Sequence, residues 1–93
     1  MSFMYLTRGE VSFDEREEVL VNPAHITEVR VMTYRATKDF PDRATLTVRV
    51  QAVNSLSVLA VDENGRPMEP AAAAEREPGE LLHLFNQAVR SLS

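Results

Sequence analysis

The chain has 93 residues, which is room for one domain with one hydrophobic core. Its composition, 44% hydrophobic against 26% charged, is that of a folded protein and argues against a disordered chain. The absence of cysteine excludes disulfides, thiolate metal sites and thiol nucleophiles, and the net charge of −4 disfavours general affinity for nucleic acid or anionic lipid.

We expect a cytoplasmic protein, because the sequence shows no signal for export or membrane insertion. The first residues lack a basic start followed by an apolar stretch, and no later segment reaches the roughly 18 apolar residues that a membrane span needs. We therefore expect neither export nor membrane insertion. The lack of cysteine fits the reducing conditions of the cytoplasm.

Strands dominate the first third of the chain. Residues 3–7 suit a pleated, half-buried surface, and Gly9 then marks a turn. Residues 11–18 carry four acids, and this density of charge predicts a solvated loop. Calcium binding is disfavoured, because a calcium loop would need a glycine at its sharp turn. A short strand follows at residues 18–21.

The middle of the chain predicts a β-hairpin. Asn22 and Pro23 favour a single helical turn, after which residues 27–34 alternate as a strand with one buried face. Residues 45–50 alternate as well, and a connection as short as residues 35–42 requires the two strands to pair antiparallel. A further strand at residues 56–61, after a turn near Asn54, is expected to join this sheet.

The last third changes period. Residues 62–77 contain an Asn-Gly turn, two prolines and four consecutive alanines, and predict an exposed linker; a short helix at residues 71–76 is the alternative. Residues 78–92 place apolar side chains at helical spacing behind Pro78, with Glu80 in the first turn and Arg90 in the last.

These elements predict one α+β domain over residues 1–93, an antiparallel β-sheet of about four to five strands packed by one C-terminal amphipathic helix. The helix must bury its apolar stripe, and one side of the sheet is the complementary surface. The other side of the sheet then stays available to a partner or to a second copy of the chain.

The order of short motifs resembles a known family. Tyr5-Leu6-Thr7, the run from Glu18 through Asn22 to Val29, a Thr-Leu-Thr-Val strand and Glu80-Leu81-Leu82 at the start of a terminal helix follow one another. This layout, over about half of the chain, resembles small bacterial FlbD-type proteins. The resemblance implies a small accessory or regulatory protein associated with flagellar or motility functions, and it implies no catalytic residues.

Chemistry-bearing motifs are few. His25 and His83 could belong to a metal site only if they converged with carboxylates, and a solvated helix face already explains His83. No nucleophile elbow and no glycine-rich phosphate loop is present, and the chain has three glycines in all. We therefore predict a protein that is not an enzyme, with no catalytic or metal-binding residues, no cofactor and no small-molecule substrate.

The predicted hairpin is basic within an acidic chain. Arginines can pair with carboxylate or phosphate, and exposed aromatic rings can stack on a base or fill a pocket of a partner; a polar face that prevents edge aggregation is the plainer explanation. We expect a protein partner or self-association as a homodimer, with nucleic-acid binding as the alternative. The candidate partner-binding residues are Arg30, Tyr34, Arg35, Lys38, Phe40, Arg43 and Arg49.

Overall fold

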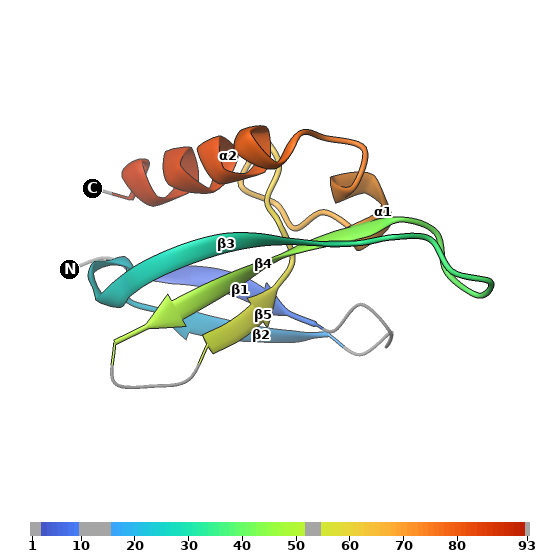
Figure 1. Cartoon of the computed structure of the whole chain (residues 1–93). Coiled ribbons are helices and arrows are strands. Elements are labelled where there is room, and N and C mark those ends of the chain that lie inside the picture. The colour runs from blue at the N-terminus through green and yellow to red at the C-terminus, as the bar shows by residue number, and fades with distance from the viewer. Residues whose placement is uncertain (1–2, 10–15, 52–54, 93) are drawn as a thin grey trace.

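The computed structural model describes residues 3–9, 16–51 and 55–92, and in these residues helices cover one side of a five-stranded sheet (Figure 1). The predicted α+β class is confirmed. The strands are β1 (Met4–Arg8), β2 (Glu17–Val21), β3 (Ile26–Tyr34), β4 (Arg43–Val50) and β5 (Ser55–Val58). The helices are the 3-10 turn η1 (Pro23–His25), α1 (Pro70–Ala73) and α2 (Pro78–Arg90).

The sheet consists of two hairpins joined by a central strand. The strand order is β2-β1-β5-β4-β3, and every pairing is antiparallel. β5 pairs with β4 along its length, with Val58 opposite Leu46, and meets β1 where Val58 lies opposite Arg8. The order leaves β2 and β3 as the two outer strands among the described residues.

The C-terminal helix lies across the sheet as the apolar stripe predicts. Leu81, Leu84 and Phe85 are buried, and the helix begins at Pro78 with Glu80 in its first turn and Arg90 in its last. It ends two residues earlier than expected, although Leu92 still packs against the core. Burying large apolar side chains stabilises such a layered arrangement by about 1.5–3 kcal/mol each.

Alternation along the strands places the core under the helices. Leu46 and Val48 of β4 are fully buried, and their β3 neighbours Val31 and Val29 pack on the same side. Glu28, Arg30 and Met32 alternate with those valines and are exposed. The predicted two faces of β3 are confirmed for residues 28–32, whereas Thr33, expected on the buried face, is exposed and Tyr34, expected on the other face, is half-buried.

Two local predictions are confirmed by hydrogen bonds and register. The Asn22 side chain accepts a hydrogen bond from the backbone N–H of Ala24 at 3.0 Å, which caps η1. β3 and β4 pair antiparallel from Tyr34 opposite Arg43 onward, with an irregularity between Ile26 and Glu28. The hairpin that carries the candidate residues is thus present.

The expected exposed linker at residues 62–77 is wrong for its central part. Met68, Pro70 and Ala73 are buried, and α1 packs on β4. Proline and alanine look like linker residues in the sequence, but small side chains let a helical turn approach a sheet closely. The alternative of a short helix is borne out at Pro70–Ala73 rather than at residues 71–76.

A tight turn precedes α1. The Asp62 carboxylate accepts hydrogen bonds from the backbone N–H groups of Asn64 at 2.8 Å and Arg66 at 3.0 Å, and Gly65 has a φ of 75°. The predicted Asn-Gly turn is therefore present. The strand before it is shorter than expected, since β5 ends at Val58 and Val61 forms an isolated bridge with Pro67.

Some predictions fall outside the described residues. Most of the acidic loop at residues 11–18 and the turn near Asn54 lie in the ranges 10–15 and 52–54. In the described part of the chain, no helix is long and apolar enough to cross a bilayer.

Candidate functional site

The loop that joins β3 to β4 projects from the body of the molecule, at the end away from both termini (Figure 1). Residues 35–42 form this loop, and we call it, with Tyr34 and Arg43 at its base, the hairpin arm. The Ala36 N–H donates to Asp42 Oδ1 at 2.6 Å, and the Thr37 N–H donates to the Phe40 carbonyl at 2.8 Å. These bonds give the arm a defined backbone.

Three of the seven candidate residues form one stack in the arm. The guanidinium carbon of Arg43 lies 4.8 Å from the centre of the Phe40 ring and 5.6 Å from that of Tyr34. Both distances are within the range of cation–π attraction. Tyr34 and Arg43 are directly opposite in the register, and the folded loop brings Phe40 to them.

Arg43 is unusual because its Nε is buried without an acceptor. The residue is 9% exposed, and it forms no ion pair among the described residues. A buried guanidinium normally pairs with a carboxylate, since its desolvation is costly. Here the two aromatic rings provide the electrostatic compensation, and the donor at Nε is left over.

The other four candidates divide between the arm and the strands. Arg35 and Lys38 are exposed in the arm, close in sequence to the stack. Arg30 lies in β3, four residues before Tyr34 at the base of the arm, and its Nε is 2.7 Å from Glu28 Oε1. Arg49 is exposed on β4, opposite Glu28. The structure therefore gathers Tyr34, Phe40 and Arg43, and it places Arg30 and Arg49 apart from them.

A cavity of about 310 Å³ lies between the base of the arm and the connection from α1 to α2. Its lining carries charges of both signs, and no histidine is among the described residues that line it. Mixed charge of this kind does not select an anion or a cation. The lining includes Tyr34, Arg35, Asp42, Arg43, Glu75, Arg76 and Glu77.

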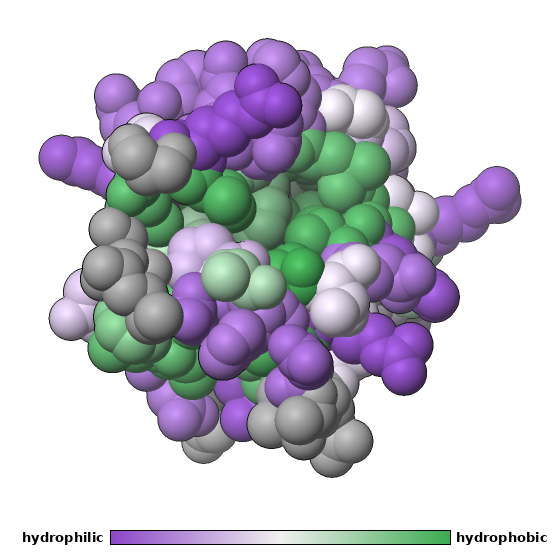
Figure 2. Space-filling model, turned by 90° about the vertical axis from the view of Figure 1, so that its left-hand side faces the viewer, coloured by the Kyte–Doolittle hydropathy of each residue, from purple (hydrophilic) through white to green (hydrophobic). Residues whose placement is uncertain are grey.

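A second hollow, of about 220 Å³, is apolar and lies between α2 and β3. Figure 2, which views the end of the molecule where α2 finishes, shows hydrophobic surface gathered beneath the polar outer face of the helix. Leu82 belongs to its lining and is 38% exposed. The lining consists of Pro23, Ile26, Val29, Leu82, Phe85, Asn86 and Val89.

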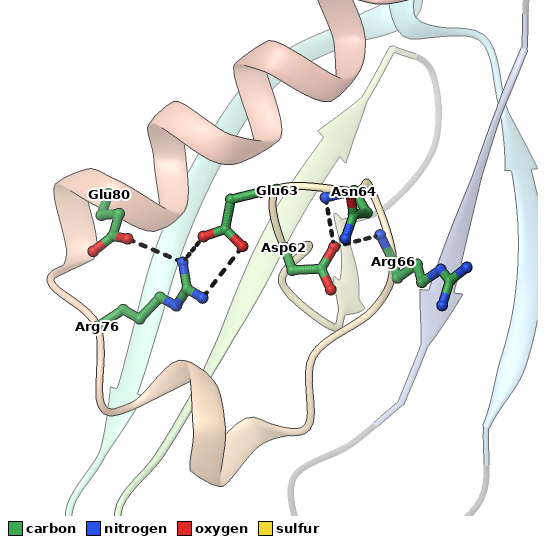
Figure 3. Close-up of polar contacts among 6 residues, drawn as sticks. All are labelled: Asp62, Glu63, Asn64, Arg66, Arg76 and Glu80. Atoms are coloured by element: carbon green, nitrogen blue, oxygen red, sulfur yellow. Dashed lines mark hydrogen bonds and ion pairs between the residues drawn. The ribbon is translucent and has the colours of Figure 1, made fainter.

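A network of ion pairs fastens the turn at residues 62–66 to the start of α2 (Figure 3). Arg76 Nη1 donates to Glu63 Oε1 and, at 3.0 Å, to Glu80 Oε1, while its Nη2 donates to Glu63 Oε2 at 3.4 Å. The hydrogen bond from Arg76 holds the pKa of the Glu63 carboxyl below its usual value, and the same bond raises the pKa of Arg76.

Sequence reasoning missed this network. Arg76 and Glu80 are four positions apart, but Arg76 precedes the start of α2 at Pro78, so helical spacing did not identify the pair. The bond from Arg76 to Glu63, thirteen positions apart, depends on how the turn and helix dock and leaves no local pattern. The network joins two elements at the surface, and Arg76 also lines the cavity at the base of the arm.

The two histidines lie on different elements. His25 ends η1 and His83 is in the middle of α2, and both are exposed. Within the described ranges, no group of three or more His, Asp or Glu side chains is placed to hold a metal ion.

Comparison with known proteins gives no match: no protein-family model, no curated protein and no solved structure matches this chain.

Proposed function

We propose that the protein is a small, non-enzymatic interaction module that binds an acidic segment of a partner protein through the hairpin arm. The observation that carries this proposal is the stack of Arg43 with Phe40 and Tyr34, which orders a loop that exposes Arg35 and Lys38. A partner carboxylate could pair with Arg35 and Lys38, which are exposed in the arm, whereas the buried Nε of Arg43 is not accessible to it. An ordered loop of this kind also reduces the entropy lost on binding.

The surroundings of the stack support a carboxylate partner. Asp39 and Asp42 are exposed in the same arm, and Asp42 accepts from the Ala36 N–H. The net charge of residues 34–43 is nevertheless +1, because these two acids face three bases, Arg35, Lys38 and Arg43. Their positive charges would steer an acidic segment toward the arm and speed its association. Lys38 can approach such an acidic segment without a movement of the sheet, because Lys38 lies in the loop.

A regulatory accessory role in the cytoplasm, of the kind that the FlbD-type resemblance implies, forms part of the proposal. It is supported by the small size of the domain and by the lack of cysteine, and within the described residues no three His, Asp or Glu side chains are grouped to hold a metal ion. Catalysis would need such groups to meet at one reacting atom. Here the exposed bases Arg35 and Lys38 share the arm, whereas Arg30 and Arg49 lie on the strands.

An NMR titration tests the proposal. The ¹⁵N-labelled protein is titrated in parallel with a glutamate-rich peptide and with a single-stranded oligonucleotide of similar charge. We expect the peptide to shift amide signals of residues 34–43, and the double variant Arg35→Glu, Lys38→Glu to abolish the shifts. Arg66→Glu is the control, because Arg66 is also an exposed base and lies in the turn before α1.

Two results would reject the proposal. Peptide signals that shift elsewhere, or not at all, would remove the arm as a binding surface. Stronger binding of the oligonucleotide, falling steeply with salt, would establish the alternative role in nucleic-acid binding.

A further inference from the structure

Strand β3 is an outer strand of the sheet with an unpaired edge in the described part of the chain. It has nine residues, and the sheet order gives it β4 as its neighbour on one side and no strand on the other. Alternate backbone N–H and C=O groups of an outer strand point away from the sheet. Such an edge is a template for the addition of another strand.

The irregularities that protect an edge are confined to one end of β3. The register shift lies between Ile26 and Glu28, so the seven residues from Glu28 to Tyr34 pair regularly with β4. This stretch contains neither proline nor lysine, the residues that commonly block an edge. The opposite outer strand, β2, is shorter and starts with two glutamates, Glu17 and Glu18.

The charges of β3 complement themselves in one register. When a strand pairs with its own copy about a two-fold axis, residues at equal distances from the axis lie opposite each other. An axis at Val29 joins residues 26–32 of the two copies, across the register shift of each, and places Glu28 opposite Arg30 of the second copy, twice; within one strand these two side chains already form an ion pair at 2.7 Å. An axis at Glu28 or at Arg30 would instead place like charges opposite each other, which destabilises a pair.

The face of β3 toward the helix offers apolar surface beside the same axis. Val29 lines the apolar hollow under α2, and Leu82 of the same lining is 38% exposed. Pairing at Val29 brings the hollows of the two copies next to each other. Apolar side chains that are now exposed to water would be covered on this face, while Glu28 and Arg30 pair on the opposite face.

We propose that the protein forms a two-fold symmetric dimer by antiparallel pairing of the β3 strands, centred on Val29, which joins two five-stranded sheets into one. Two-fold dimers bury the same patch on both copies, as this register does. The dimer goes beyond the proposed function and is compatible with it. The two hairpin arms extend past opposite ends of the paired segment and stay uncovered.

Charge reversal with light scattering tests the dimer. We expect the mass of the wild-type protein to be twice that of the chain at high concentration. Glu28→Arg sets two arginines against each other at both symmetric positions, since Arg30 of the second copy faces position 28, and should weaken dimerisation on the order of tenfold. The double variant Glu28→Arg, Arg30→Glu restores opposite charges and should restore the dimer.

Glu18→Arg is the matched control, because Glu18 is an exposed glutamate on the other outer strand, and the dimer should be unchanged in it. Circular dichroism establishes that each variant is folded. A monomeric wild type at millimolar concentration would overturn the proposal, and so would a dimer that Glu28→Arg leaves intact. Peptide binding by the arm is measured separately on monomeric Glu28→Arg, so the two proposals can fail independently.

Discussion

The guanidinium carbon of Arg43 lies 4.8 Å from the centre of the ring of Phe40, a residue in the loop that precedes it. Phe40 is 40% exposed, and its ring covers the guanidinium of Arg43 on one side. Its position depends on the Thr37 hydroxyl, which accepts from the Phe40 N–H at 3.3 Å. The order of the arm and the burial of Arg43 therefore depend on each other.

Removal of the Phe40 ring should weaken the arm. Phe40→Ala uncovers Arg43 and deletes one cation–π contact, with an expected loss of about 0.5–1 kcal/mol in the free energy of unfolding. The measurement is denaturant unfolding. Phe3→Ala is the control, because Phe3 is similarly exposed and lies over no arginine among the described residues. Equal losses in the two variants would mean that the stack contributes nothing to stability.

The buried side of α1 gives a second prediction. Ala73 is fully buried and its neighbour Ala72 is exposed in the same helix. Ala73→Leu should overpack the contact with β4 and destabilise the fold by about 1–3 kcal/mol, whereas Ala72→Leu should be nearly neutral. Thermal unfolding of the two variants provides the comparison. A neutral Ala73→Leu would return residues 62–77 to the exposed linker that the sequence predicted.

Periodic features were predictable from the sequence, and contacts between distant residues were not. The stripe with Leu81, Leu84 and Phe85 identified the helix and its buried face because side-chain periodicity is local information. Burial of Ala73 could not be predicted in this way, since alanine suits both a solvated helix and a close contact. Whether a short segment docks depends on the space beside β4, which tertiary packing determines.

The candidate site shows the same division. The basic character of the hairpin was visible in the sequence, and the antiparallel pairing that sets Tyr34 opposite Arg43 followed from the length of the connection. The return of Phe40 onto Arg43 depends on the loop hydrogen bonds, for which no pattern was available. For this reason the sequence supplied seven candidates of equal weight, and the geometry brings three of them together.

Two glycines should respond in opposite directions to the same substitution. Gly65 has a φ of 75°, which side chains rarely adopt, so Gly65→Ala should cost on the order of 1 kcal/mol despite the open space around it. Gly79 lies in the first turn of α2 with ordinary torsions and open space, so Gly79→Ala should stabilise by about 0.4–1 kcal/mol. Chemical unfolding curves measure both, and a stabilising Gly65→Ala would contradict the assignment of the turn.

Acid should weaken the bond between Glu63 and Arg76 in a predictable pH range. The pKa of Glu63 is lower in the folded protein than its usual value of 4.5, because of the hydrogen bond from Arg76. The unfolded chain therefore binds more protons in that range, so the stabilisation is complete above the unfolded pKa and is lost as the pH falls through the folded one. Wild type should melt at a higher temperature than Glu63→Gln at neutral pH, and the difference should disappear in acid.

Because the pair is at the surface, salt should reduce the difference as well. Glu75→Gln is the control, since Glu75 is an exposed carboxylate that forms no ion pair among the described residues; a difference that persists below the folded pKa would mean that charge is not its cause.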